Sequence, residues 1–346
     1  YLIISASKAT EPILAIIDSG NYQEDEQVNV EGFDFFMENA LNYVATADGV
    51  TGSNDEGPDD KIMTWYNDTV VLVHPVLPYK VNVKWGQKWP ENVYCPNKIA
   101  GCAPVAIAQL LSYFKPEMSF DVTFEGRPCD HMTIDWNEIL KHKTSYNSIE
   151  RPFFDPVACQ GCTVAHEQLA VLLRQIGVWA HSTYEFDIDN NPTVTSTDIG
   201  YLYSVTDMLL PNCMKSFVDT GRIYDDMGEG IALVTGVTIN ESNTLESHAW
   251  IIDGKGSITY RITLYTYYNP KTGEYATREF KSETAKYLHC NWGWRGVYNG
   301  YFLENAFNTN SGRDFPIVVP VGPVTLGANT ISSRSTYLGV YGYAYH

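Results

Sequence analysis

The segment from Ile99 to Gln109 constrains the local structure of this chain more than any other stretch, because it places a cysteine directly before an apolar run. Pro104 suits the first turn of a helix, where its missing N–H would have had no intrahelical partner. Gly101 allows a neighbouring segment to approach closely. The pattern therefore predicts a buried helix with Cys102 at its N-terminal end.

A thiol at the start of a helix ionises more easily, because the positive end of the helix dipole stabilises the thiolate. The thiolate is the reactive form, so Cys102 is a predicted nucleophile. The alternative is a small cysteine in the core, where free cysteines are often found. A catalytic thiol also needs a base, and the base needs a group that orients it.

Two later segments supply a base and an orienting group. An apolar strand begins at His248 and closes in an Asp-Gly turn at residues 253–254, where the aspartate is expected to be structural. A second strand-like run ends with Asn291 and Trp292. Papain-like proteases use the order cysteine, histidine, asparagine, and the 146 residues from Cys102 to His248 fit their spacing.

An upstream glutamine and the tryptophan complete the predicted site. Gln87 lies in a Trp-Gly-Gln segment that is, on its own, typical of a loop. Its amide and the backbone N–H of Cys102 could both donate to an oxyanion. Asn291 is predicted to orient His248, and Trp292 to shield that contact from water. Core packing explains a buried tryptophan equally well.

Taken together, these motifs resemble the streptopain family of bacterial cysteine peptidases, which are papain-like. The matching residues are Trp85 and Gln87, Gly101 and Cys102 followed by Ala108 and Gln109, His248-Ala-Trp250, Asn291-Trp-Gly-Trp294, and Asn299-Gly-Tyr-Phe302. Ser247 stands where the family has glycine, and Ala103-Pro-Val105 replaces Val-Ala-Thr. Neither departure removes a catalytic group.

The resemblance implies a secreted cysteine endopeptidase that is made as a zymogen and cuts peptide bonds through a thiolate–imidazolium pair. It also implies an α+β, papain-like fold with a helical left part and an antiparallel β right part. Protein or peptide substrates are the expected partners, and no cofactor or metal is expected. A papain-like amidase or acyltransferase, and a catalytically silent surface binding protein, are the alternatives.

The N-terminal residues resemble the end of a propeptide of this family. Two short apolar strands precede an amphipathic helix over residues 32–47, and a polar stretch over residues 47–60 is typical of a linker open to proteolysis. We predict that residues 1–68 are a partial propeptide, acting as an intramolecular inhibitor, and that residues 69–346 are the catalytic domain. The boundary is expected between Asn54 and His74. An ordinary N-terminal subdomain is the alternative.

The rest of the chain shows helical patterns first and strand patterns later, which fits an α+β architecture. Helices are predicted at residues 165–177 and 197–210, with a polar loop over residues 184–197. Strands are predicted at residues 231–238, 248–253, 259–268, 287–292 and 301–303. No function is assigned to the segment from Phe315 to His346.

Charge and hydropathy exclude two classes of partner. The net charge of −18 argues against nucleic acid, because phosphates need a basic surface. No apolar run approaches the roughly 18 residues that a membrane span needs. The chain starts at Tyr1, so any signal peptide would lie upstream. A secreted, cell-surface or periplasmic bacterial location is implied by the resemblance alone.

The seven cysteines are an odd number, and reserving one as the nucleophile leaves six that could form up to three disulfides. Cys159 and Cys162 form a Cys-x-x-Cys pair, and His166, Cys129 and His131 would complete the ligand types of a zinc site. A second Cys-x-x-Cys is missing, which favours a local disulfide or free thiols over zinc.

Overall fold

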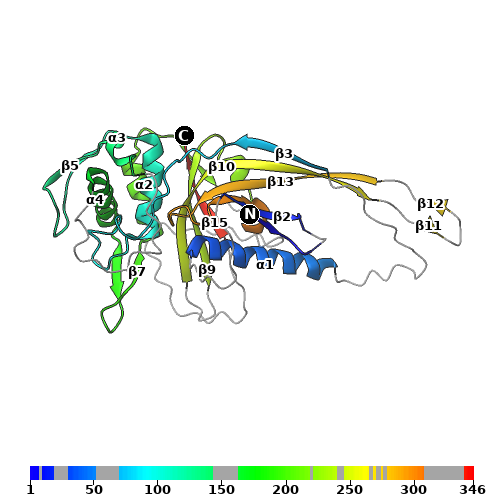
Figure 1. Cartoon of the computed structure of the whole chain (residues 1–346), viewed down its shortest axis with the longest axis horizontal. Helices are drawn as coiled ribbons and strands as arrows, with labels where there is room; N and C mark the ends of the chain where they lie inside the picture. The colour runs from blue at the N-terminus through cyan, green and yellow to red at the C-terminus, as the bar shows by residue number, and fades with distance from the viewer. Residues whose placement is uncertain are drawn as a thin grey trace.

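The structure, a computed structural model, describes residues 1–7, 10–18, 30–51, 70–142, 163–218, 221–239, 245–264, 268–269, 274–275, 279–307 and 339–346. Its helices gather mainly at one end, and an antiparallel sheet extends from them across the molecule (Figure 1). This is the predicted α+β class, with most of the helices before the long strands of the sheet.

One antiparallel sheet organises the molecule. Its strands lie in the order β1 (Leu2–Ile4), β2 (Ile13–Ile17), β14 (Gly300–Leu303), β13 (Glu279–Asn291), β10 (Leu245–Leu264), β9 (Ile231–Ile239), β15 (Gly339–Tyr345) and β8 (Lys215–Val218). A further strand, β3 (Val70–Leu77), pairs with the far half of β10. Small ribbons are formed by β4 (Ser119–Asp121) with β5 (His131–Thr133), β6 (Thr183–Phe186) with β7 (Pro192–Ser196), and β11 (Tyr268–Asn269) with β12 (Glu274–Tyr275).

The helices cover both faces of this sheet. At one end lie α2 (Cys102–Phe114), α3 (Trp136–Ile139), α4 (Val164–Trp179) and α5 (Ile199–Leu209), and α1 (Glu31–Thr51) runs along the sheet (Figure 1). Two short helices, α6 (Ile223–Asp226) and the 3-10 helix η2 (Glu304–Phe307), complete the set. Local signals start these helices where expected, since Thr163 caps α4 and Asp198 caps α5 with their side chains.

Alternation along the strands gives the sheet two apolar faces. In β10, Ala249 and Ile251 pack in the core that contains α2 and α4, whereas Trp250 and Ile252 pack in the core that contains α1. Successive strand side chains point to opposite faces, so a strand that is buried on both sides is apolar throughout. By the same alternation, His248 shares the α1 face with Trp250.

Four of the local predictions need correction. The expected strand at 248–253 and residues 259–264 of the expected strand at 259–268 are parts of one strand, β10, and the expected turn at residues 253–254 is a shift of register within it. The expected polar loop over residues 184–197 contains the β6–β7 hairpin. Residues 47–51, expected in the linker, continue α1. The glycine in the Asp-Gly pair suggested a turn, but a bulge accommodates it equally well.

The N-terminal segment, by which we mean residues 1–51, is built into the sheet. Strand β2 pairs with β14, extending the sheet by two strands at that edge. The expected division at residues 68–69, and the rest of the predicted cleavage region up to residue 69, lie outside the described residues. Residues 315–338 of the C-terminal segment also lie outside them, whereas β15 pairs between β9 and β8.

Candidate active site

Cys102 is the first residue of α2, and it is half-buried at the N-terminal end of an otherwise buried helix. Gly101 caps the helix with a φ of 92°, a conformation that favours glycine. A Cβ at Gly101 would lie 2.9 Å from Cγ2 of Thr195 in β7, so the hairpin packs closely against the residue before the thiol. The helix dipole therefore acts on a thiol that remains reachable.

Gln87 lies in the irregular loop that precedes α2, and a backbone hydrogen bond ties the two segments together. The N–H of Ala100 donates to the carbonyl of Gln87 at 2.9 Å, two residues before Cys102. The Gln87 side chain is buried, and its Nε2 has no hydrogen-bond partner within the part of the chain that the structure describes. A buried amide donor without a partner is uncommon in proteins and is available to a ligand.

His248 lies at the α1 face of β10 and contacts the backbone after β13. Its Nε2 is 3.0 Å from the carbonyl oxygen of Trp292, and the ring is buried. The N-terminal segment covers this ring. A Cβ at Gly32, in the first turn of α1, would lie 2.8 Å from Cδ2 of His248 and 2.3 Å from Cε3 of Trp292. The absence of a side chain at Gly32 is thus what allows α1 to approach the imidazole.

Asn291 lies on the opposite face of the sheet, against α2. Its Nδ2 donates to the carbonyl of Val83 at 2.9 Å, and its Oδ1 accepts from Nε2 of Gln109 at 3.0 Å. Among the described residues, no hydrogen bond joins Asn291 to His248 or Cys102 to His248. The structure thus places Cys102 and Asn291 on the α2 side, and His248 on the α1 side against the Trp292 carbonyl.

Trp292 is fully buried beneath α1. Its ring centroid lies 5.1 Å from that of Trp250 and 5.0 Å from that of Phe302, and its Nε1 donates to the carbonyl of Tyr298 at 3.0 Å. Phe33 of α1 stacks on Tyr298 at 4.2 Å. These contacts make Trp292 part of the core that the N-terminal segment shares with the sheet.

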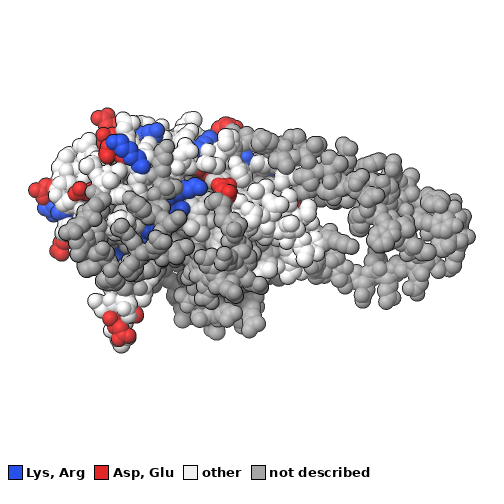
Figure 2. Space-filling model, in the orientation of Figure 1, with Lys and Arg blue, Asp and Glu red and all other residues white. Residues whose placement is uncertain are grey.

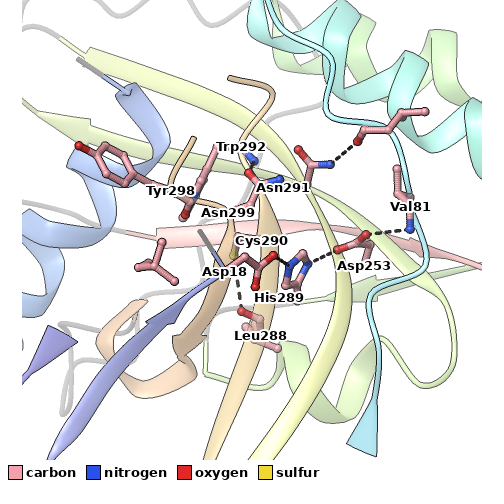
Figure 3. A network of polar contacts seen from close by, with 12 residues as sticks. Asp18, Val81, Asp253, Leu288, His289, Cys290, Asn291, Trp292, Tyr298 and Asn299 are labelled. Atoms are coloured by element: carbon pink, nitrogen blue, oxygen red, sulfur yellow. Dashed lines mark hydrogen bonds and ion pairs between the residues drawn. The ribbon is translucent and has the colours of Figure 1, made fainter. Parts of the chain in front are cut away.

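A buried histidine that the sequence analysis did not single out joins the N-terminal segment to the sheet (Figure 3). His289 donates or accepts at both ring nitrogens: Nδ1 is 2.6 Å from Oδ1 of Asp253, and Nε2 is 3.0 Å from Oδ2 of Asp18. Burial disfavours the imidazolium, but the Asp253 carboxylate and the Asp18 hydrogen bond outweigh it and raise the pKa of His289 to about 9. Asp253 also accepts the N–H of Val81 at 2.9 Å.

Part of this hydrogen-bond network could have been predicted from the sequence. His289 precedes Asn291 by two residues and so shares its face of β13. Asp253, expected to be structural, is its partner on the neighbouring strand. Asp18, however, comes from a segment 271 residues away, and no local pattern links the two positions.

Five of the seven cysteines lie in the part of the chain that the structure describes. Cys95, Cys102, Cys129, Cys213 and Cys290 are free thiols, so none of these is in a disulfide. Burial raises the pKa of Cys95 to about 12, which keeps that thiol protonated. Cys159 and Cys162 lie outside the described residues. Within the described residues no group of three or more potential ligands is arranged to hold a metal ion.

Comparisons with known proteins agree with the class that these features define, a cysteine peptidase with a papain-like arrangement of helices and sheet. The family model of the peptidase C10 family matches residues 85–302, a span that contains Gln87, Cys102, His248 and Asn291. The chain therefore belongs to the peptidase C10 family, the streptopain family that its motifs resemble, and it is a cysteine-type peptidase.

Solved structures give a second comparison. A cysteine-to-alanine mutant fragment of prointerpain A from Prevotella intermedia aligns with 87% of this chain and 84% of its own, at 16% identity and a TM-score of 0.51, which shows the shared fold. Active wild-type interpain A from the same organism aligns with 65% of this chain and 85% of its own, at 18% identity and a TM-score of 0.41. No curated protein matches the sequence. None of the described helices is both long enough and apolar enough to cross a bilayer.

Proposed function

We propose that this cysteine peptidase is a secreted endopeptidase made as a zymogen, with residues 1–68 as its partial propeptide. The observation that carries the proposal is the contact of α1 with His248. Gly32 packs against the imidazole and Trp292, while Cys102 opens α2 without a hydrogen bond to His248 among the described residues. An N-terminal segment in this position keeps the base away from the nucleophile.

The chemistry begins once the N-terminal segment has been removed. His248 then turns from the Trp292 carbonyl toward Cys102 and takes the thiol proton, and the α2 dipole supports the resulting thiolate. Asn291 exchanges its present partners for the imidazole and orients it. Trp292 follows Asn291 in the sequence, and its carbonyl contacts His248. Its side chain limits the access of water to the contact between the imidazole and Asn291. The contacts of Asn291 with Val83 and Gln109 belong to the covered state in this proposal.

Peptide cleavage then follows in two steps. The thiolate attacks the substrate carbonyl, and the oxyanion accepts hydrogen bonds from Nε2 of Gln87 and from the backbone N–H of Cys102. His248 protonates the leaving amine, and water hydrolyses the thioester. The unpartnered Nε2 of Gln87 supports this role, because an oxyanion would supply the acceptor that the buried amide lacks.

The test follows the intact mass of the purified chain under reducing conditions, with Cys102→Ala as the control. We expect the wild type alone to lose its N-terminal segment, and an epoxide inhibitor of thiol proteases to form an adduct on Cys102. Casein hydrolysis without a lag or a loss of mass would contradict the zymogen. Mass spectrometry of peptide products separates hydrolysis from acyl transfer. Fractionation of producing cells tests the proposed export to the surface, the periplasm or the medium.

A further inference from the structure

The loop that carries Gln87 is fixed along its length by hydrogen bonds from surrounding segments. The carbonyl of Trp85 accepts the N–H of Arg295 at 3.2 Å, and the carbonyl of Gln87 accepts the N–H of Ala100 at 2.9 Å. The guanidinium of Arg295 donates to the carbonyl of Trp89. Residues 85–91 belong to no helix or long strand, so these bonds replace those of regular secondary structure.

Glu91 holds the peptide group between Trp85 and Gly86, which lies one residue before Gln87. Its Oε1 accepts the N–H of Gly86 at 3.3 Å and lies 3.3 Å from Nε2 of His142. The Glu91 side chain is fully buried, and His142 is 5% exposed. Oε2 of Glu91 has no hydrogen-bond partner among the described residues. A buried carboxylate with incomplete pairing is costly, so a purely structural role is a poor explanation for it.

The surroundings of Glu91 fix its position from several sides. The indole Nε1 of Trp85 donates to the carbonyl of His142 at 2.6 Å, which ties the loop to the end of the α3 segment. A Cβ at Gly86 would lie 2.7 Å from Cγ of Arg295, so Gly86 is held between the Arg295 stem and the Glu91 carboxylate. Burial lowers the pKa of Arg295, and the nearby charge of Glu91 opposes that shift.

We propose that Glu91 is a positioning residue for the oxyanion hole, acting through the Gly86 peptide to set the place of the Gln87 amide. The inference rests on the proposed role of Gln87. The carboxylate fixes the Trp85–Gly86 peptide, one residue before Gln87, and His142 fixes the carboxylate. The geometry needs an acceptor oxygen at this place, and a shorter side chain cannot reach Gly86 without moving the loop.

The experiment is a double-mutant cycle between Glu91 and Gln87. Each variant is made as the full chain and allowed to process itself, and its active sites are then titrated with an epoxide inhibitor. We measure kcat and KM on a peptide amide, and the rate at which iodoacetamide alkylates Cys102. Alkylation uses the thiolate but forms no oxyanion. Glu304→Asp is the matched control, since Glu304 is another buried carboxylate that accepts one backbone N–H, from Tyr224 at 2.7 Å.

We expect Glu91→Asp to lower kcat by about 10- to 100-fold, with KM and the alkylation rate within about 2-fold of wild type. Glu91→Gln keeps an acceptor oxygen and is expected to stay within about 3-fold of wild type. Gln87→Ala is expected to lower kcat by about 10²- to 10³-fold, and adding Glu91→Asp to it should cost nothing further. Glu304→Asp should leave kcat unchanged.

Other outcomes overturn the inference in distinguishable ways. Additive losses in the double variant, or equal slowing of alkylation, would show that Glu91 acts on the whole site and not through Gln87. A loss with Gln87→Ala but none with Glu91→Asp would overturn this inference alone. No loss with Gln87→Ala would overturn the proposed oxyanion role and the inference with it. If Glu91→Asp does not fold, His142→Leu enters the same cycle with the same expectations.

Discussion

At the scale of single residues, His289 links two parts of the molecule that the proposed processing would separate. Its partners are Asp253 of the sheet and Asp18 of the N-terminal segment (Figure 3). Its pKa is raised to about 9 in the folded chain, above the ordinary value near 6.5. The stabilisation from this shift is therefore complete below about pH 6.5 and is lost as the pH rises through about 9.

The first prediction concerns the pH dependence of this contact. In a Cys102→Ala background, which prevents self-cleavage, we expect Asp18→Asn to lower the thermal unfolding midpoint at pH 6 to 7. The difference should shrink toward pH 10, where His289 is neutral in both proteins. The raised pKa corresponds to about 3 kcal/mol of pH-linked stability, to which Asp18 and Asp253 both contribute.

The control for that measurement is an exposed carboxylate with an ordinary ion pair. Asp130 pairs with Arg127 at 2.9 Å and is 91% exposed. Asp130→Asn is expected to change stability by less than about 1 kcal/mol at every pH, since exposed pairs contribute little. An Asp18→Asn effect that is as large at pH 10 as at pH 6 would argue against the charged contact.

The site residues were predictable to different degrees. Cys102 lies where the Gly-Cys-Ala-Pro pattern predicts, because proline and glycine set the start of a helix locally. The present contacts of His248 were not predictable, since they depend on a helix that approaches from more than 200 residues away. Glu91 gave no signal either. A single carboxylate in a loop looks exposed until the surrounding segments are known to bury it.

At the scale of elements, α1 depends on a glycine for its fit over the site. We expect Gly32→Ala to shorten the lag before self-processing, because the added carbon would overlap Trp292 and the ring of His248. Alanine favours a helix by about 1 kcal/mol over glycine, so the overlap must exceed that gain. Mass spectrometry over time measures the lag.

A glycine-to-alanine change in another helix provides the control. Gly200 lies in the first turn of α5, where an added carbon would meet only the capping side chain of Asp198, at 3.0 Å. The processing lag of Gly200→Ala should equal that of the wild type. A longer lag in Gly32→Ala would indicate that α1 docks more firmly with the extra carbon, contrary to our expectation.

The β6–β7 hairpin is the second element whose position matters to the site. Its acidic tip, which includes Asp187 and Asp189, projects from the helical end of the molecule (Figure 2). Asn97 joins the hairpin to the loop before Cys102. It donates to the carbonyl of Val194 at 2.9 Å and accepts from Oγ1 of Thr195 at 3.1 Å.

We expect Asn97→Ala to lower the free energy of unfolding by about 1–3 kcal/mol, because it leaves buried polar groups of the hairpin without partners. Added glutamyl-specific protease should also cut the hairpin faster, at Glu185. Asn191→Ala is the matched control in the same hairpin. Asn191 is exposed and bonds to the side chain of Asp187, so its loss should cost much less. Equal effects of both variants would contradict the anchoring role.

At the scale of the whole molecule, the N-terminal segment completes the sheet at one edge. Strand β2 pairs with β14 through residues 300–302, and β1 lies outside β2. We predict that processing exposes this edge, so that amide hydrogens of β14 that now bond to β2 exchange faster with solvent. Hydrogen–deuterium exchange on the Cys102→Ala chain and on the processed enzyme measures this, with β9, which the strand does not touch, as the internal reference.

The arrangement of layers was more predictable than the connections between them. Helical periodicity in residues 165–177 and apolar runs after residue 231 are local patterns, and both gave elements of the expected kind. The length of β10 was not predictable, because its polar outer half extends through pairing with β3 and β13 and not through burial of an apolar pattern. The pairing with β3 spans 178 residues or more and leaves no mark in the sequence of either strand.

The position of β15 in the sheet determines when, during synthesis of the chain, the sheet can be completed. Of the strands in the sheet, β15 is the last to be synthesised, yet it pairs with β9 on one side and β8 on the other, which are made more than 100 residues earlier. Among the described strands β8 has no other neighbour, so it is unpaired and one edge of β9 stays open until residues 339–345 emerge. The sheet can therefore be completed only after β15 has been synthesised. Until then the open edges of β8 and β9 must be kept from pairing with other chains.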